Sequence, residues 1–164
     1  MSGRSSRALA LAALLIVLLT GVALATPVPV VSLSDGAGEM LAVLDEGEPL
    51  TYSYRQSIYD VPVLEEFVRA GDRIKLLRVR SPDIRSIEYF RWDGNIVQDE
   101  KQMWTQDAPP NEHRDLVIRV TLLGQQRMST PRWTLDLFDR FGGAIVTLSV
   151  DRRPRGLVLV RGTR

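Results

Sequence analysis

The chain of 164 residues contains no cysteine and a single histidine, His113. The lack of cysteine excludes disulfide bridges, thiolate zinc sites, a cysteine nucleophile and a lipid-modified cysteine. One imidazole cannot form a multi-histidine metal centre, and no nucleophile-elbow motif accompanies His113. Glycine-rich phosphate loops are also missing, because "DGAGE" and "FGGA" fit neither the dinucleotide-binding nor the P-loop spacing. We therefore expect no metal and no cofactor.

The first 25 residues have the pattern of a secretory leader. Arg4 and Arg7 form a positive head, the run from Ala8 to Ala25 carries no charge, and Ala23-Leu24-Ala25 gives a small-x-small cleavage site. The uncharged run approaches the roughly 20 residues that span a bilayer, so cleavage as a signal peptide and retention as a membrane anchor both stay open. In either case the positive-inside bias predicts that the chain after Pro27 is exported, to the periplasm or the cell surface.

Charge argues against one class of partner. Without the first 25 residues, Lys+Arg falls from 21 to 19 against 20 acidic residues, so the exported part carries a charge of about −1. A near-neutral domain lacks the clustered positive charge that nucleic-acid binding needs. The stretch "DRRPRGLVLVRGTR" is locally basic, which indicates either a solvated tail or a contact with anionic lipid headgroups. Its arginines are Arg152, Arg153, Arg155, Arg161 and Arg164.

The rest of the chain predicts an all-β domain. Residues 26–39, with two prolines and a Ser/Asp/Gly cluster, indicate a linker, and residues 40–164 a single β-rich domain. Short runs rich in β-branched and aromatic residues alternate with turn signals, which predicts an antiparallel β-sandwich or a partly open barrel. The strand-like runs are "EMLAVLD", "PLTYSYRQS", "PVLEEFVRA", "DRIKLLRVR", "IRSIEYFRW", "RDLVIRVTLL", "RWTLDLFDRF", "AIVTLSVDR" and "GLVLV". Among them, only "PDIRSIEYFRW" could instead form a short helix.

One long polar segment, residues 98–115, is predicted to be a loop. Long loops on a rigid sheet often carry binding surfaces. Trp104 lies inside this segment and Trp92 shortly before it, and either ring could face a ligand. Packing of Trp104 over the sheet edge is the alternative.

The stretch "YSYRQSIYDVPVLEEF", residues 52–67, predicts a β-hairpin with unusual polar content. With Tyr59 and Asp60 at the centre of the turn, Tyr54 lies opposite Glu65 and Gln56 is the diagonal neighbour of that carboxylate. A carboxylate on a mostly apolar face must find donors or take up a proton. A loop one residue longer would instead place Glu66 opposite the tyrosines. On the other face, this register predicts an ion pair between Arg55 and Glu66.

This hairpin resembles a motif of a bacterial family of unknown function, whose members carry a Tyr, then His-Ser, then Pro-Val-x-Glu-x-Phe on the same spacing. Many members are small exported or membrane-tethered proteins encoded beside the TAXI branch of the tripartite ATP-independent periplasmic (TRAP) transporters. The resemblance covers about residues 39–153. The matching positions are Tyr54, Ser57, Pro62, Val63, Glu65 and Phe67. Gln56 stands where the family has histidine, and a glutamine can hydrogen-bond but cannot titrate.

The resemblance implies an accessory protein of a TRAP-type solute transporter, with membrane transporter subunits as partners. We therefore expect a non-enzymatic, exported β-domain in which Tyr54, Gln56, Ser57 and Glu65 lock the hairpin or contact a partner. A second hypothesis is a binding module for a small solute or an envelope polymer, with Trp92 and Trp104 as aromatic contacts. A third is a carboxylate hydrolase that uses Glu65 with an acid such as Asp136.

Overall fold

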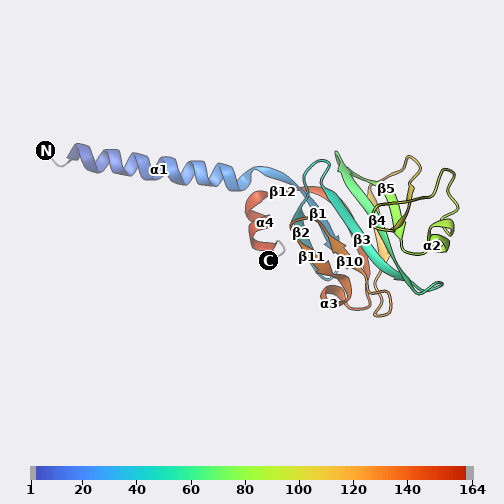
Figure 1. The fold of residues 1–164 in the computed structure, drawn as a ribbon. Coiled ribbons are helices and arrows are strands. Elements are labelled where there is room, and N and C mark those ends of the chain that lie inside the picture. Colours follow the sequence, from blue (N-terminus) through green and yellow to red (C-terminus); the bar gives the residue numbers. More distant parts are fainter. Residues whose placement is uncertain (1–2, 162–164) are drawn as a thin grey trace.

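The computed structural model describes residues 3–161, and the side chains of residues 9–160. The chain is mostly β, as predicted, with two antiparallel sheets in the arrangement of a β-sandwich (Figure 1). The smaller sheet has the order β2-β1-β12-β9, formed by β1 (Pro27–Ser34), β2 (Glu39–Val43), β9 (Asp115–Arg119) and β12 (Ile145–Pro154). The larger sheet has the order β11-β10-β3-β4-β5-β7-β6, with β8 beside β5.

The strands of the larger sheet are β3 (Pro49–Gln56), β4 (Val61–Ala70), β5 (Arg73–Ser81), β6 (Val97–Gln98), β7 (Trp104–Asp107), β8 (Glu112–His113), β10 (Arg127–Ser129) and β11 (Thr134–Asp136). Four helices are described: α1 (Gly3–Ala25), α2 (Ile84–Glu88), α3 (Leu137–Phe141) and α4 (Arg155–Arg161). Apolar side chains from both sheets form the main buried core. Among them are Leu33 and Leu148 from the smaller sheet, and Leu50, Phe67 and Ile74 from the larger one.

The segment expected to be a linker is instead part of the smaller sheet. Strand β1 pairs with β12 along its whole length and with β2 from Val30 onward. Pro27 and Pro29 lie in the part of β1 that has a strand on one side only, where the missing N–H groups of proline are tolerated. The prolines thus indicated a strand edge, and Leu33 further along β1 is fully buried.

Three short helices replace predicted strand residues. Helix α2 confirms the helical alternative for its segment, because the Asp83 carboxylate caps it by accepting from the Arg85 N–H at 3.0 Å. Asp136 caps α3 in the same way, accepting from Phe138 at 3.0 Å and Asp139 at 3.1 Å. The strand prediction for "GLVLV" is wrong.

Helix α4 begins directly where the pairing of β12 with β1 ends. The pairing of β1 and β12 ends at Pro27 opposite Pro154, and the chain before Pro27 is helical. The Arg155 N–H then donates to the Thr26 carbonyl at 3.0 Å. Helix α4 buries Val158 beside Val30, so apolar burial is achieved without strand pairing.

The predicted loop 98–115 also contains strands. Strand β7 pairs with β5 over four residues, and β8 places His113 opposite Ile74. The loop prediction for this segment is wrong because it assumed that polar side chains are exposed. Thr105 and Gln106 in β7 are instead buried.

Helix α1 extends away from the sheets and contacts α4 near its end (Figure 1). Its large apolar side chains, from Leu9 to Leu24, are exposed. At the contact with α4, a Cβ on Gly156 would lie 3.4 Å from the Leu24 carbonyl oxygen. Over the residues that the structure describes, no helix combines the length and hydropathy of a membrane span.

The buried position of β1 yields a stability prediction. Leu33→Ala should lower the free energy of unfolding by about 2–5 kcal/mol, because it leaves a cavity in the core. Val117→Ala, at a side chain that is 70% exposed, should change it by less than about 0.5 kcal/mol. Urea unfolding of the two variants measures the difference, and equal effects would contradict the place of β1 in the core.

Candidate functional site

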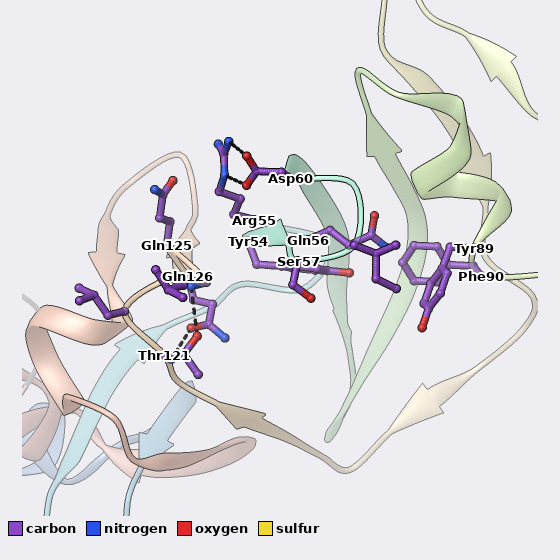
Figure 2. Close-up of a pocket in the computed structure, with 14 residues that line it drawn as sticks. Tyr54, Arg55, Gln56, Ser57, Asp60, Tyr89, Phe90, Thr121, Gln125 and Gln126 are labelled. Carbon is purple, nitrogen blue, oxygen red and sulfur yellow. Dashed lines mark hydrogen bonds and ion pairs between the residues drawn. The ribbon is translucent and has the colours of Figure 1, made fainter.

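A pocket of about 880 Å³ opens at the end of the sandwich that lies farthest from α1 (Figures 1 and 2). Three segments form its walls: the end of β3 with the following turn, the two residues after α2, and the loop between β9 and β10. Figure 2 shows the hairpin residues between this loop on one side and the rings of Tyr89 and Phe90 on the other. The lining residues are 54–58, Asp60, Tyr89, Phe90 and 121–126.

The hairpin that carries the family-like motif has a four-residue turn. Tyr54 lies opposite Val63, and Tyr52 lies opposite Glu65, so the predicted register is wrong by two residues. The turn is longer because the Asp60 N–H donates to the Gln56 carbonyl at 2.8 Å and Asp60 adopts a positive φ of 56°. A shift of two residues keeps every side chain on its face. Glu65 therefore still shares the inner face with both tyrosines and Gln56.

Glu65 is a carboxylate in a mostly apolar environment. The Tyr54 hydroxyl interacts with this carboxylate, and the Tyr52 and Tyr54 rings stack with centroids 5.2 Å apart. Burial raises the pKa of Glu65 above its ordinary value, and the Tyr54 bond opposes this only in part. Within residues 9–160, Glu65 has no salt bridge to lysine or arginine. Burial likewise raises the pKa of Tyr52 to about 12.

Gln56 also lines the pocket, and its amide oxygen is a buried acceptor without a partner. Its side chain is only 6% exposed, and its Oε1 has no hydrogen-bond partner. A buried amide oxygen without a donor is unfavourable by about 1–3 kcal/mol. An apolar side chain at this position would avoid the penalty.

The loop opposite the hairpin is held in one conformation by Gln126. Its Oε1 accepts from the Thr121 N–H at 2.8 Å, and its Nε2 donates to the Arg119 carbonyl at 2.7 Å. A Cβ at Gly124 would lie 2.7 Å from the Gln126 Oε1, so a larger residue there would push the Gln126 side chain out of its present position. The Gly124 carbonyl accepts from the Arg55 N–H at 2.7 Å, which fastens the loop to β3.

The rim of the pocket is apolar and carries one neutralised ion pair. Ile58, Leu122 and Leu123 are all largely exposed there, Leu123 to 84%. The Arg55 guanidinium makes two bonds to the Asp60 carboxylate, one of them 2.7 Å from Nη2 to Oδ2. The predicted pair of Arg55 with Glu66 is therefore wrong. Glu66 instead accepts from two arginines on the outer face, as described below.

The remaining motif residues are structural or peripheral. Val63 and Phe67 are buried in the sheet, and the Pro62 carbonyl accepts from the Ser81 hydroxyl at 2.9 Å. Ser57 is exposed in the turn and lines the pocket. Of the motif residues, Tyr54, Gln56 and Ser57 thus reach the pocket.

The two tryptophans that the binding-module hypothesis offered as aromatic contacts lie outside the pocket lining. Trp92 packs against the core and the Phe90 ring, with centroids 4.8 Å apart. Trp104 is half-buried in β7, opposite Ser81. The aromatic lining comes instead from Tyr54, Tyr89 and Phe90. Sequence reasoning missed the last two, because their segment had been assigned to a strand.

The other candidate chemistry is not assembled. Asp136 lies in a row with Arg127, Ser53 and Leu64 across β11, β10, β3 and β4, whereas Glu65 lies in the neighbouring row. Adjacent rows of a sheet point to opposite faces, so Glu65 and Asp136 cannot act on one substrate from one cleft. Asp136 also caps α3. Over the described residues, no group of three or more metal-ligating side chains occurs.

The C-terminal arginine cluster is described only in part. Arg153 is bound by Glu39 at 3.0 Å and by Asp151 at 3.1 Å, while Arg152 and Arg155 are exposed. Arg164 and the side chain of Arg161 lie outside the described residues.

Comparisons of the chain with family models, curated proteins and solved structures find no match. Functional inference therefore depends on the geometry of the site.

Glu65 and Glu66 should affect stability in opposite directions. The pKa of Glu65 is raised, so its contribution to stability is present below the ordinary value of 4.5 and is lost as the pH rises through the folded-state pKa. Glu65→Gln cannot ionise, so it avoids the loss of stability that ionisation of Glu65 causes. The substitution should raise the free energy of unfolding at pH 7 by about 1 kcal/mol or more, and it should change this free energy little below pH 4.

Glu66→Gln is the matched control. Although partial burial favours protonation of Glu66, bonds from Arg78 at 2.6 Å and Arg80 at 2.9 Å together hold its pKa below the ordinary value. Its stabilisation is present at pH 7 and is lost as the pH falls, so Glu66→Gln should lower the free energy of unfolding by about 1–3 kcal/mol at pH 7. Chemical denaturation from pH 3 to 8 compares the variants, and a loss of stability in Glu65→Gln at pH 7 would contradict the assignment.

Gln56→Met should stabilise the protein. Methionine has the length of glutamine and removes the unpaired acceptor, which should raise the free energy of unfolding by about 1 kcal/mol. Thermal unfolding measures this. A destabilised variant would show that the Gln56 amide supports the fold.

Proposed function

We propose that this chain is an extracytoplasmic, non-catalytic β-domain protein that binds a small solute with a largely apolar body in the pocket at the mouth of the sandwich. The observation that carries the proposal is the pocket of about 880 Å³, whose rim exposes the apolar side chains of Ile58, Leu122 and Leu123. These side chains would cover the apolar body of the solute.

A binding role explains these features better than a purely structural one. A hairpin that served only stability would gain from apolar residues at Gln56 and Glu65. The three exposed apolar side chains of the rim would also be unfavourable if water alone contacted them. The pocket is bounded by three separate segments, a shape that favours a small solute over an extended envelope polymer.

The proposed location rests on α1 and on the exposed arginines at the end of the domain where α1 and α4 meet. The exposed apolar side chains of α1 agree with an export segment, either cleaved or retained in the membrane. Exposed Arg152 and Arg155 lie at the end of the domain where α1 and α4 meet, which supports a contact with anionic headgroups. The pocket would then face away from the membrane.

The accessory role beside a TRAP-type transporter rests on the motif resemblance. Tyr54, Gln56 and Ser57, which belong to that motif, all line the pocket. The proposal is that the domain holds a solute near the transporter subunits, and that the motif marks the binding site.

Filling the pocket tests the binding role. Titration of the full chain with the neutral apolar dye N-phenyl-1-naphthylamine should give a fluorescence increase that Ser57→Trp reduces at least about fivefold, because the indole ring occupies the mouth. Asn111→Trp, at an exposed position outside the pocket lining, is the matched control and should titrate like the parent chain. Dye bound by α1 is common to all three proteins. Identical titration of all three would refute the binding role.

A further inference from the structure

We propose that the open edge of strand β9 is the interface through which two copies of this chain associate. Strand β9 of one copy pairs antiparallel with β9 of the other, with Val117 on the two-fold axis. The two smaller sheets then join into one continuous sheet. Strand β9 lies outside the pocket lining, so the interface does not depend on the proposed binding function.

Strand β9 has a strand partner on one side only. It ends the order β2-β1-β12-β9 of the smaller sheet, and among the described residues its partner is β12 alone. The Val120 N–H donates to the Ala144 carbonyl at 2.9 Å, so Val120 and, by alternation, Ile118 direct their backbone groups toward β12. The backbone groups of Asp115 and Val117 therefore point to the open side. Such a row of unpaired backbone groups is a template for another strand.

The open edge is closed at one end by a side-chain amide. Gln126 donates from Nε2 to the Arg119 carbonyl at 2.7 Å and accepts at Oε1 from the Thr121 N–H at 2.8 Å. This amide takes the place that a neighbouring strand would have beyond Arg119. At the other end, the chain enters β9 from β8, which belongs to the larger sheet. The open edge is therefore β9 itself, Asp115–Arg119.

The side chains along the open edge are self-complementary. Antiparallel pairing about Val117 places Asp115 of one copy directly opposite Arg119 of the other, and symmetry forms this pair twice. Asp115 and Arg119 are exposed, and neither has a salt bridge within residues 9–160. Val117, which is 70% exposed, lies opposite Val117 of the other copy. An exposed apolar side chain and two charges of opposite sign thus all find partners in a second copy.

Charge also selects this register over its neighbours. A shift of two residues in either direction keeps the same side chains on the outer face. It would place Val117 opposite Asp115 or Arg119, however, and would leave no pair of opposite charges across the two strands. A charge opposite an apolar side chain lacks the stabilisation of an opposite-charge pair. The pairing centred on Val117 is therefore the favoured one.

Cysteine cross-linking tests the interface, because the chain has no cysteine of its own. In the proposed dimer the two copies of residue 117 form a hydrogen-bonded pair with Cα atoms about 5.5 Å apart, a separation that a disulfide can span. The full chain with Val117→Cys, in detergent micelles that cover α1, should therefore form a disulfide-linked dimer when diamide is added.

Ile145→Cys is the matched control. Ile145 is 59% exposed on β12, on the same outer face, and its backbone partner is Arg119. Its two copies would be separated by three strand spacings, at least about 14 Å, which a disulfide cannot span. Any association through α1 is common to both proteins. Val117→Cys should cross-link at least about tenfold faster than Ile145→Cys.

Charge variants in the Val117→Cys background test the register. Asp115→Arg alone, or Arg119→Asp alone, places like charges opposite each other and should slow cross-linking at least about tenfold. The double variant, Asp115→Arg with Arg119→Asp, restores opposite charges across the two strands. It should cross-link at a rate within about twofold of Val117→Cys.

Three outcomes would overturn the interface. Val117→Cys and Ile145→Cys could cross-link at equal rates, or the single charge variants could cross-link as fast as Val117→Cys. If the single variants are slow and the double variant is equally slow, the loss does not come from charge pairing between Asp115 and Arg119. None of these residues lines the pocket, so the dye titration of Ser57→Trp tests the proposed function separately.

Discussion

The site depends on the pairing of β3 with β4, because this pairing fixes which side chains of the two strands point into the sandwich. Leu50, Val63 and Phe67 must point into the sandwich because their apolar surface has to leave water. Strand alternation then carries every second residue inward with them. Tyr54, Gln56 and Glu65 are therefore internal by register, and the pocket forms where the apolar part of that face ends.

The same alternation separates two neighbouring carboxylates. Glu65 points inward, where burial raises its pKa, and Glu66 points outward to Arg78 and Arg80, which lower the pKa of Glu66. A β-bulge between β4 and β5 contributes to this arrangement. The register shifts between Glu66 and Phe67, so that Arg78 turns outward toward Glu66 although Ile74 and Leu76 on the same strand point inward.

The two ends of the domain have different character. Helices α1 and α4 meet at one end, beside the first residues of β1 and the last of β12 (Figure 1). The hairpin turn, the loop held by Gln126 and the residues after α2 meet at the other end around the pocket. A molecule bound there would lie away from α1, which agrees with a domain held at one end and open to solutes at the other.

Much of the fold followed from local pattern. Alternating short runs and glycine or proline turns predicted an antiparallel β protein, and the face shared by Tyr54, Gln56 and Glu65 was correct although the register was not, because a shift of two residues preserves the face. The capping aspartates of α2 and α3 were visible in the sequence, but short runs such as "GLVLV" suit both helix and strand. Whether such a run forms a strand depends on whether a partner strand is available.

The sequence by itself determined the composition of the hairpin: a motif with a carboxylate, two tyrosines and a glutamine among apolar residues. Only the tertiary structure decided what those groups meet. Tyr89, Phe90 and the loop around Leu122 and Leu123 come from distant parts of the chain, and the two tryptophans offered as alternative aromatic contacts lie elsewhere. The physical reason is that a strand's alternation is local, whereas a pocket is formed by segments whose approach depends on packing of the whole core.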